Sequence, residues 1–459
     1  MLFNSHIFML LFLPLLLAGW YFLNWKKKFQ LAQGYLIGMS LWFYAYANLQ
    51  YLWLLLFSCL IGWLLSCLPE KIFSEKGKKV LTGVGCVFHL GLLGYFKYSN
   101  FFLENLNTVF HTDFPMLQIL LPVGISFYTF QQLAYLIDRC RGDAPRDSFF
   151  DYLTFMVYFP QLLQGPILLR SEFMGQLKEP ERRRFHAERF SEGIQFFVFG
   201  LAKKVLLADT LAKAVNYGYS NVSMLDSISA LLLAAGYLTE LYFDFSGYCD
   251  MAVGLGKMIG LEVAENFDAP FHSASVKEFW RRWHMTLGRF FTRYVYIPLG
   301  GNRRGKMRTL CNVMIVMLLS GLWHGAAWTF VLWGFLHGVG MIWDNLEHPH
   351  LPKKWMRQAA TFAYVCMTFV FFRAESIAQG IDVLKSIVSL KWNGFVFQMA
   401  SALDMTECYI ITKALSMKLP GLLSWFWLGI FVVLIAICFR VLSGEKVSGV
   451  VALKRQKGY

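Results

Sequence analysis

Long apolar windows without charge are the feature of this sequence that most restricts its fold. Stretches of about 17 to 21 residues lack Lys, Arg, Asp and Glu almost entirely, which is the length that a helix needs to cross a hydrocarbon core of about 30 Å. Of the 459 residues, 56% are hydrophobic and only 16% are charged, a balance that excludes an ordinary water-soluble domain. The chain is therefore predicted to be an all-α membrane protein that crosses the bilayer many times.

The positions of these windows predict about eleven transmembrane helices. They lie at about 7–24, 33–50, 51–68, 80–96, 117–137, 193–208, 227–245, 310–330, 331–343, 358–372 and 422–439. With the amino terminus outside and the carboxyl terminus in the cytoplasm, nearly all basic clusters fall on the cytoplasmic side, as the positive-inside rule requires. These clusters include Arg182–Arg184, Arg281-Arg282, Arg303-Arg304 and a tail with Lys446, Lys454, Arg455 and Lys457. The exception is Lys203-Lys204, which lies inside the sixth window.

The net charge of +14 could in principle indicate a nucleic-acid partner. The basic residues, however, form short clusters between apolar segments, which is where Lys and Arg contact anionic membrane lipid, so membrane lipid and not nucleic acid is the expected partner. The nine cysteines are scattered and form no CxxC pair or His/Cys ligand spacing. Neither a disulfide framework nor a metal site is expected.

Two regions are apolar without fitting a simple span. Residues 151–169 are interrupted by Pro160, Gly165 and Pro166, and residues 249–299 carry too many charges to cross lipid. Irregular backbone at membrane depth is tolerated where protein buries it or a wet cavity receives it, so both regions are predicted to be re-entrant or interfacial and to line a cavity reached from the cytoplasm. We predict one domain, 1–459, with amino-terminal helices (1–137), a catalytic core (138–345) and carboxyl-terminal helices (346–459).

His324 is the residue most suggestive of function. It lies in a run from Thr309 to Trp343 that contains no Lys, Arg, Asp or Glu, and an ionisable group at such a position usually faces the protein interior or a cavity. Trp323 and Trp328 could wall a substrate site around it. The alternative is a hydrogen-bonded core histidine that joins two helices, and His337 in the same run makes that alternative harder to dismiss.

Two further groups of polar residues have competing interpretations. His284, with Arg281 and Glu278 within two helical turns, could serve acid–base chemistry or phosphate recognition, or could belong to an amphipathic interfacial helix. Asp244, among aromatic residues at the end of the seventh window, is a candidate substrate-binding residue, and it could also orient a histidine or cap a helix. Spacing alone does not decide between these possibilities.

Seven segments occur in the order seen in one family. They are Val123–Gln131, Phe159–Ile167, Tyr242–Asp250, Glu265–Phe271, Phe279–His284, Tyr296–Asn302 and Leu322–Trp328. In these segments the chain resembles the membrane-bound O-acyltransferase (MBOAT) family, in particular the bacterial branch that contains alginate O-acetyltransferases and teichoic-acid D-alanyl transferases. The similarity covers nearly the whole chain up to about Asp344. Departures such as Ala264, where proline is frequent in the family, leave the substrate open.

The resemblance implies that His324 matches the catalytic histidine and His284 the second, cytoplasm-facing histidine of the family. It implies O-acyl transfer, most simply of acetyl, from a cytoplasmic donor such as acetyl-CoA or an acyl carrier protein, with no bound cofactor. Arg281 and Arg282 would contact donor phosphates. The location would be the bacterial plasma membrane, the acceptor an exported or cell-surface polysaccharide, and the partner an extracytoplasmic esterase-like protein of SGNH type. D-alanyl transfer to teichoic acid and lipid-linked sugar transport are the alternatives, and a covalent acyl intermediate stays open.

Overall fold

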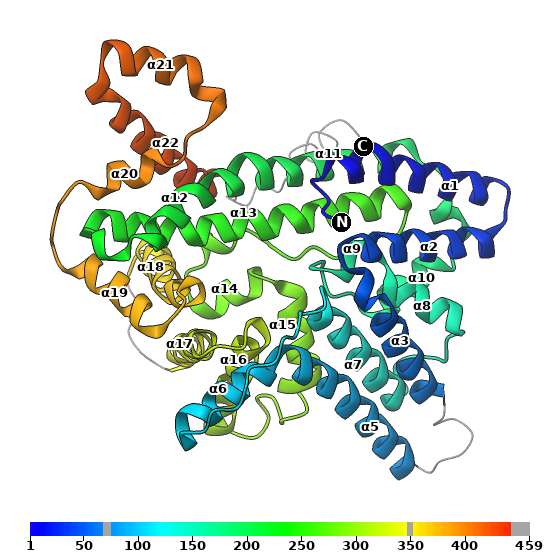
Figure 1. The fold of residues 1–459 in the computed structure, drawn as a ribbon. Helices are drawn as coiled ribbons and strands as arrows, with labels where there is room; N and C mark the ends of the chain where they lie inside the picture. Colours follow the sequence, from blue (N-terminus) through cyan, green and yellow to red (C-terminus); the bar gives the residue numbers. More distant parts are fainter. Residues whose placement is uncertain (68–74, 347–351, 442–459) are drawn as a thin grey trace. The chain divides into compact units, whose positions relative to one another are not determined.

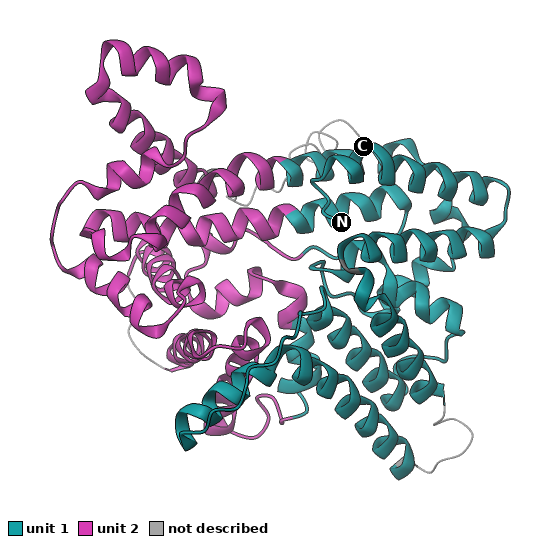
Figure 2. Ribbon diagram, viewed as in Figure 1, with its two compact units in different colours: residues 1–201, 248–265, 289–298 teal, residues 202–247, 266–288, 299–459 magenta. Residues whose placement is uncertain are grey.

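Helices are the only regular elements of the protein in the residues that its computed structural model describes, which are 1–67, 75–346 and 352–441 (Figure 1). This finding confirms the predicted all-α class. The chain divides into two compact units that alternate along the sequence (Figure 2). Unit 1 comprises residues 1–201, 248–265 and 289–298, and unit 2 comprises 202–247, 266–288 and 299–459. The division into amino-terminal helices, catalytic core and carboxyl-terminal helices stays a prediction.

Unit 1 contains most of the helices before residue 201 and one short helix further along the chain. They are η1 (Phe8–Phe12), α1 (Leu13–Trp25), α2 (Phe29–Asn48), η2 (Leu49–Tyr51), α3 (Leu52–Cys67), α5 (Glu75–Leu93), η3 (Gly94–Tyr98), α6 (Ser99–Phe110), α7 (Ile125–Arg141), α8 (Phe149–Val157), α9 (Phe159–Leu162), α10 (Arg170–Leu177), η4 (Pro180–Arg183) and η8 (Thr292–Tyr296). Three helices, α11 (Ala187–Ala202), α13 (Ser227–Ile259) and α15 (Met285–Phe291), contribute residues to both units.

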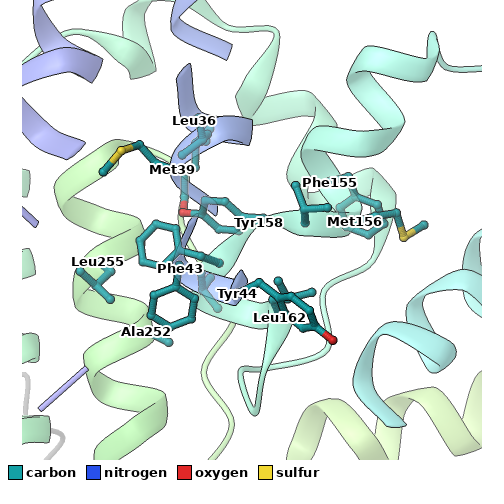
Figure 3. Packing of buried hydrophobic residues seen from close by; sticks show 14 of the residues in the cluster. Leu36, Met39, Phe43, Tyr44, Phe155, Met156, Tyr158, Leu162, Ala252 and Leu255 are labelled. Carbon is teal, nitrogen blue, oxygen red and sulfur yellow. The ribbon is translucent and has the colours of Figure 1, made fainter. Parts of the chain in front are cut away.

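The core of unit 1 is built from large side chains that are almost completely buried. Figure 3 shows Phe43 and Tyr44 of α2 among residues of α8, α9 and α13, with Tyr158 between α8 and α9. The Tyr158 hydroxyl donates a hydrogen bond to the backbone oxygen of Leu261 at 3.0 Å, so its polar end is satisfied inside the core. This packing fixes the short helices α8 and α9, which are too short to be stable alone.

Unit 2 contains the remaining helices. They are η5 (Lys203–Ala208), α12 (Asp209–Ser220), η6 (Val222–Met224), η7 (Pro270–His272), α14 (Val276–Arg282), α16 (Lys306–His324), α17 (Trp328–Asn345), α18 (Lys354–Arg373), α19 (Ile377–Val388), α20 (Phe395–Ser401), η9 (Thr406–Cys408), α21 (Tyr409–Lys418) and α22 (Pro420–Val441). Its core gathers aromatic side chains such as Trp333, Phe369 and Phe431, each at most 1% exposed.

Six helical stretches among the described residues are long and apolar enough to cross a membrane. They are Phe8–Trp25, Leu49–Cys67, Lys76–Phe110, Ser227–Ile259, Lys306–His324 and Pro420–Phe439. A multi-pass membrane protein is thereby supported, while the count of about eleven spans and the sidedness of the termini stay predictions. The predicted basic carboxyl-terminal tail and part of the loop around residues 70–79 lie outside the described residues.

The window at 117–137 is wrong as a continuous helix, because α7 begins only at Ile125 and the residues before it are extended. The extended segment is held along α6 by two asparagine side chains. Asn100 exchanges two hydrogen bonds with the backbone of Leu117, at 2.9 and 2.8 Å, and Asn107 does the same with Phe114, at 2.9 Å each. These side chains satisfy backbone groups that a helix would otherwise pair, so an apolar composition alone did not produce a helix here.

The seventh window is also longer than predicted, because α13 continues from Ser227 to Ile259. Its charged second half is accommodated by specific partners, as Lys257 pairs with Glu192 of α11 at 3.3 Å within unit 1. Residues 249–259 are therefore helical, and the irregular part of the predicted 249–299 region begins only after them. Residues 151–169 form no helix of spanning length, only α8, α9 and the start of a non-helical stretch.

Candidate active site

The predicted catalytic histidine lies at the tip of a helical hairpin in unit 2. His324 is the last residue of α16, Gly325 and Ala327 are extended, and α17 begins at Trp328. The window at 310–330 is thus not one helix. The hairpin is tight because its two helices meet at glycines: a Cβ on Gly321 would lie only 3.3 Å from the Cα of Gly334.

Aromatic rings surround the partly buried imidazole of His324. Trp333 of α17 and Phe372 of α18 pack against it edge to face, with ring centroids at 5.2 and 5.1 Å, and Trp323 lies at 4.9 Å. The contact with Trp323 agrees with the expected wall of tryptophan. Trp328, proposed for the same wall, begins α17 with 56% of its surface exposed. Trp333 and Phe372 were not singled out from the sequence, because nothing in their spacing separates them from ordinary core residues.

His284 lies beside His324, with the two ring centroids 6.4 Å apart. It occupies the turn between α14 and α15, is only 1% exposed, and packs against Phe245 and Trp323 at 4.8 and 5.9 Å. The structure therefore brings the two histidines together, while the cytoplasm-facing position of His284 stays a prediction. Burial lowers the pKa of His284 to about 3, so this imidazole is neutral at physiological pH.

The backbone and the hydrogen bonds of His284 are unusual. Its φ is +47°, in the left-handed region that non-glycine residues rarely adopt. Its Nδ1 lies 3.2 Å from the side-chain oxygen of Asn266. Its Nε2 is buried and has no hydrogen-bond partner in the part of the chain that the structure describes. Asn266 belongs to one of the family-like segments, Glu265–Phe271, but nothing in its spacing from His284 predicted that the two side chains would pair.

His337, which complicated the case for His324, has a different environment. It is completely buried, and both of its ring nitrogens have partners. The indole N–H of Trp280 donates to Nδ1 at 3.2 Å, and Nε2 lies 2.9 Å from the hydroxyl of Thr368. Because an indole N–H can only donate, Nδ1 is the unprotonated nitrogen and Nε2–H donates to Thr368. His337 is thus the hydrogen-bonded core histidine that the sequence could not distinguish from a functional one.

Asp244 neither caps a helix nor orients a histidine, because it lies inside α13 and pairs with Lys204. Lys204 also contacts Asp209 at 2.8 Å. The neighbouring Lys203 is buried, with its ammonium group 5.9 Å from the ring centroid of Tyr242. These contacts explain how the Lys203-Lys204 pair is tolerated in an apolar window. Contact of Asp244 with substrate stays a prediction.

The arginines predicted to contact phosphate differ from each other. Arg282 donates to Glu278 at 2.9 Å and also lies 4.0 Å from Asp268, so two carboxylates already engage its guanidinium. Arg281 is exposed. The predicted cluster of His284, Arg281 and Glu278 therefore does not form, because Glu278 pairs with Arg282 while His284 is turned into the core. The contact of either arginine with a donor stays a prediction.

Two buried polar groups beside His324 lack hydrogen-bond partners among the described residues. The indole N–H of Trp333, completely buried, has no acceptor among the described residues, and the Nε2 lone pair of His284 has no donor. Buried polar groups are nearly always paired, so such exceptions mark places where another molecule can bind. Among residues 1–67, 75–346 and 352–441, no three His, Cys, Asp or Glu side chains gather as metal ligands do.

The fold and this site define a multi-pass helical membrane protein with a pair of histidines in an aromatic environment. The chain belongs to the membrane-bound O-acyltransferase family, whose pattern matches residues 142–381, and it is accordingly an O-acyltransferase. The matched range contains both histidines, Asn266 and Trp333.

Related proteins are bacterial. The chain is 35% identical over 423 residues to the peptidoglycan O-acetyltransferase of Helicobacter pylori, a match that covers 85% of this chain and 80% of that protein. It is 39% identical over 389 residues to the probable alginate O-acetylase AlgI of Azotobacter vinelandii, covering 82% of this chain and 76% of that protein. Identity to the teichoic acid D-alanyltransferase of Streptococcus thermophilus is 28%, covering 52% of this chain and 58% of that protein.

Proposed function

We propose that this protein transfers an acyl group, most simply acetyl, from a thioester donor on the cytoplasmic side toward a hydroxyl acceptor on an exported or cell-surface polysaccharide. The observation that carries the proposal is the position of His324 among Trp323, Trp333 and Phe372, with His284 beside it. The similarity to proteins named for the O-acetylation of peptidoglycan and alginate supports a polymeric acceptor.

The residues around His324 suit acyl transfer because a side chain is available for each proton transfer and for the negative charge that develops. The acceptor oxygen attacks the carbonyl carbon of the thioester while its proton moves to His324. The carbonyl oxygen then carries negative charge, for which the unpartnered indole N–H of Trp333 is the available donor. Collapse of the intermediate breaks the carbon–sulfur bond, and the departing thiolate takes the proton back from His324. The aromatic surroundings exclude water and so limit hydrolysis of the donor.

The charges of the hairpin support a cytoplasmic donor. Its base carries exposed basic residues before α16 and in its first turn, Arg303, Arg304, Lys306 and Arg308, and Lys353 and Lys354 lie exposed at the start of α18. Basic residues at span ends favour the cytoplasmic face. The 19 residues of α16 cover about 28 Å, so His324 would lie near the opposite end of the span. Trypsin should therefore cleave at Arg303-Arg304 in inverted membrane vesicles and spare this loop in right-side-out vesicles.

We further propose acetyl-CoA or an acyl carrier protein as the donor and an extracytoplasmic esterase-like protein of SGNH type as the partner that completes transfer. An anionic donor suits the basic hairpin base. No resident cofactor is part of this scheme. Copurification of the protein from native membranes with and without cross-linking, followed by mass spectrometry, would identify the partner.

The test of the proposed function is mass analysis of surface polysaccharide from cells that carry wild-type protein, His324→Ala, or no protein. We expect acylation to disappear with His324→Ala although the variant stays in the membrane fraction. The matched control is His186→Ala, because His186 is exposed in a loop of unit 1 and should leave acylation unchanged. Normal acylation by His324→Ala would refute the catalytic role.

The same measurement separates the alternatives. The mass of the added group distinguishes acetyl from D-alanyl, the transfer named for the relative from Streptococcus thermophilus. A transporter of lipid-linked sugar would change the amount of surface polymer without changing its acyl content. Acylation that depends on His324 would therefore exclude transport as the function.

A further inference from the structure

We propose that Asn266 is a positioning residue that holds His284 in the tautomer with hydrogen on Nδ1, so that Nε2 presents its lone pair to an O–H or N–H group of substrate bound beside His324. The proposal rests on the proposed function for the substrate, whereas the tautomer itself follows from contacts inside unit 2. It assigns a role to the Glu265–Phe271 segment, whose function the catalytic scheme leaves unexplained.

The orientation of the Asn266 amide is fixed by a backbone group. The N–H of Thr286 lies 3.0 Å from the atom assigned as the Asn266 side-chain oxygen. A backbone N–H can only donate, so that atom must be an acceptor and is the oxygen instead of the nitrogen. The hydroxyl of Thr286 donates to the same oxygen at 3.0 Å. Two donors from Thr286 therefore identify the amide oxygen and hold it in place.

The tautomer of His284 follows from that assignment. Its Nδ1 lies 3.2 Å from the same oxygen. If Nδ1 carried a lone pair, two acceptors would face each other in a buried site and repel, so Nδ1 carries the hydrogen and donates. In a neutral imidazole the other nitrogen then holds the lone pair. Nε2 of His284 is accordingly an acceptor, and it is the atom without a partner among the described residues.

Several backbone contacts hold Asn266 and His284 in this arrangement. Asn266 also accepts a hydrogen bond from the N–H of Met285 through its own backbone oxygen at 3.0 Å, so it binds three consecutive residues, His284 and the first two residues of α15. Asn266 is 2% exposed and His284 is 1% exposed. The strained φ of His284 persists because these contacts over-determine it, and strain of this kind concentrates at functional sites.

His284 is better suited to accept a hydrogen bond than to bind a proton at neutral pH. Burial lowers the pKa of its imidazole to about 3, so it does not keep a proton at neutral pH. Its lone pair can still accept a hydrogen bond from a neutral group. A substrate O–H or N–H that satisfies Nε2 would be placed next to His324, whose ring is the titratable neighbour in contact with His284.

The direct test is ¹⁵N NMR of purified full-length protein labelled at histidine, with His284→Gln used to identify the signals of His284 by difference. Protonated and unprotonated ring nitrogens resonate far apart, so the spectrum reports the tautomer without any substrate. We expect Nδ1 protonated and Nε2 unprotonated from pH 5 to pH 8. A protonated Nε2 would overturn the proposal. Since this measurement needs no activity, it can succeed or fail independently of the acyltransferase assay.

Variants at position 266 test whether the tautomer matters. Asn266→Asp keeps an acceptor next to Nδ1 and adds a charge, so it should retain the tautomer and make His284 titrate at higher pH than in the wild type. Asn266→Leu removes the acceptor and should lose the tautomer preference, with acylation of surface polysaccharide falling about 10- to 100-fold. If Asn266 only stabilised the fold, Leu would not alter the tautomer of His284.

Thr286→Val is the matched control, because it removes one hydroxyl bond to Asn266 and keeps the backbone N–H that orients the amide. We expect a lower melting temperature with an unchanged His284 tautomer. An altered tautomer in Thr286→Val would contradict the argument that the backbone N–H suffices. Should Asn266→Leu fail to fold, the wild-type spectrum and the titration of Asn266→Asp still decide the proposal.

Discussion

The close approach of the two hairpin helices provides a quantitative test of how His324 is positioned. A Cβ added to Gly321 would lie 2.3 Å from the backbone oxygen of Phe330, whereas ordinary van der Waals contact begins at 3.4 Å. The obstructing atom is backbone, which cannot rotate away as a side chain can. Gly321→Ala therefore forces α16 and α17 apart by about 1 Å at a point one turn before His324.

A displacement of that size should be costly for catalysis. Reacting groups must be held to about 0.5 Å, and a misplacement of about 1 Å costs roughly 100-fold in rate. Overpacking of a well-packed interface also costs about 1 to 3 kcal/mol of stability. We therefore expect Gly321→Ala to insert into the membrane and to melt at a lower temperature, with acylation of surface polysaccharide reduced about 100-fold.

Gly338→Ala in the same hairpin is the matched control. The atoms that its new Cβ would meet belong to the side chain of Met314, with the sulfur at 2.7 Å and the terminal methyl at 3.0 Å. Methionine rearranges easily, so this variant should keep acylation within a few-fold of the wild type. Wild-type acylation by Gly321→Ala, or equal losses in both variants, would refute the argument that backbone contact at Gly321 sets the position of His324.

Three further predictions concern the groups around His324. Trp333→Phe keeps an aromatic ring but removes the N–H, and should lower acyl transfer by about 100-fold. It should also lower the melting temperature, because the smaller ring leaves a cavity in the core. Wild-type acylation would exclude the oxyanion role. His337→Leu leaves the Trp280 N–H without its acceptor, so thermal unfolding should show a loss of about 1 to 3 kcal/mol. The pKa of His284 falls from 6.5 in the unfolded chain to about 3 in the folded protein, so the unfolded chain binds the proton more readily and the stability of the fold should fall as the pH drops from about 6.5 toward 3. The melting temperature should therefore decrease between pH 7.5 and pH 5, and it should decrease less in His284→Gln than in the wild type.

The sequence predicted the class of fold well because length and charge decide it. Several windows without charge became helices, as in α1, α3 and α22. The window at 117–137 was misjudged because Pro122 and Gly124, the latter with a φ of +77°, interrupt it just before α7, and because the Asn100 side chain satisfies the backbone of Leu117. Boundaries fail in such places since they depend on contacts between residues distant in the sequence.

The candidate site was predicted only in part, as the fold was. The cost of an imidazole in an apolar run identified His324, and the family-like segments identified His284. The contact between their rings was not predictable, because it depends on a turn with a left-handed residue at His284 and on the break after His324. Trp333 was missed for the opposite reason: as a buried aromatic it looks like core, and its unpartnered N–H is visible only in three dimensions.

Comparison of His284 with His337 explains why burial alone could not decide which histidine is the better candidate for a functional role. Both are at most 1% exposed and both should be neutral at physiological pH, since an imidazole enclosed by apolar rings is poorly solvated when charged. They differ in whether their second nitrogen is satisfied: Thr368 engages Nε2 of His337, whereas Nε2 of His284 has no described partner. An unsatisfied acceptor costs about 1 to 3 kcal/mol in the resting protein. Binding of a substrate that donates to Nε2 would recover that energy, so selection for activity can maintain a group that selection for stability alone would remove.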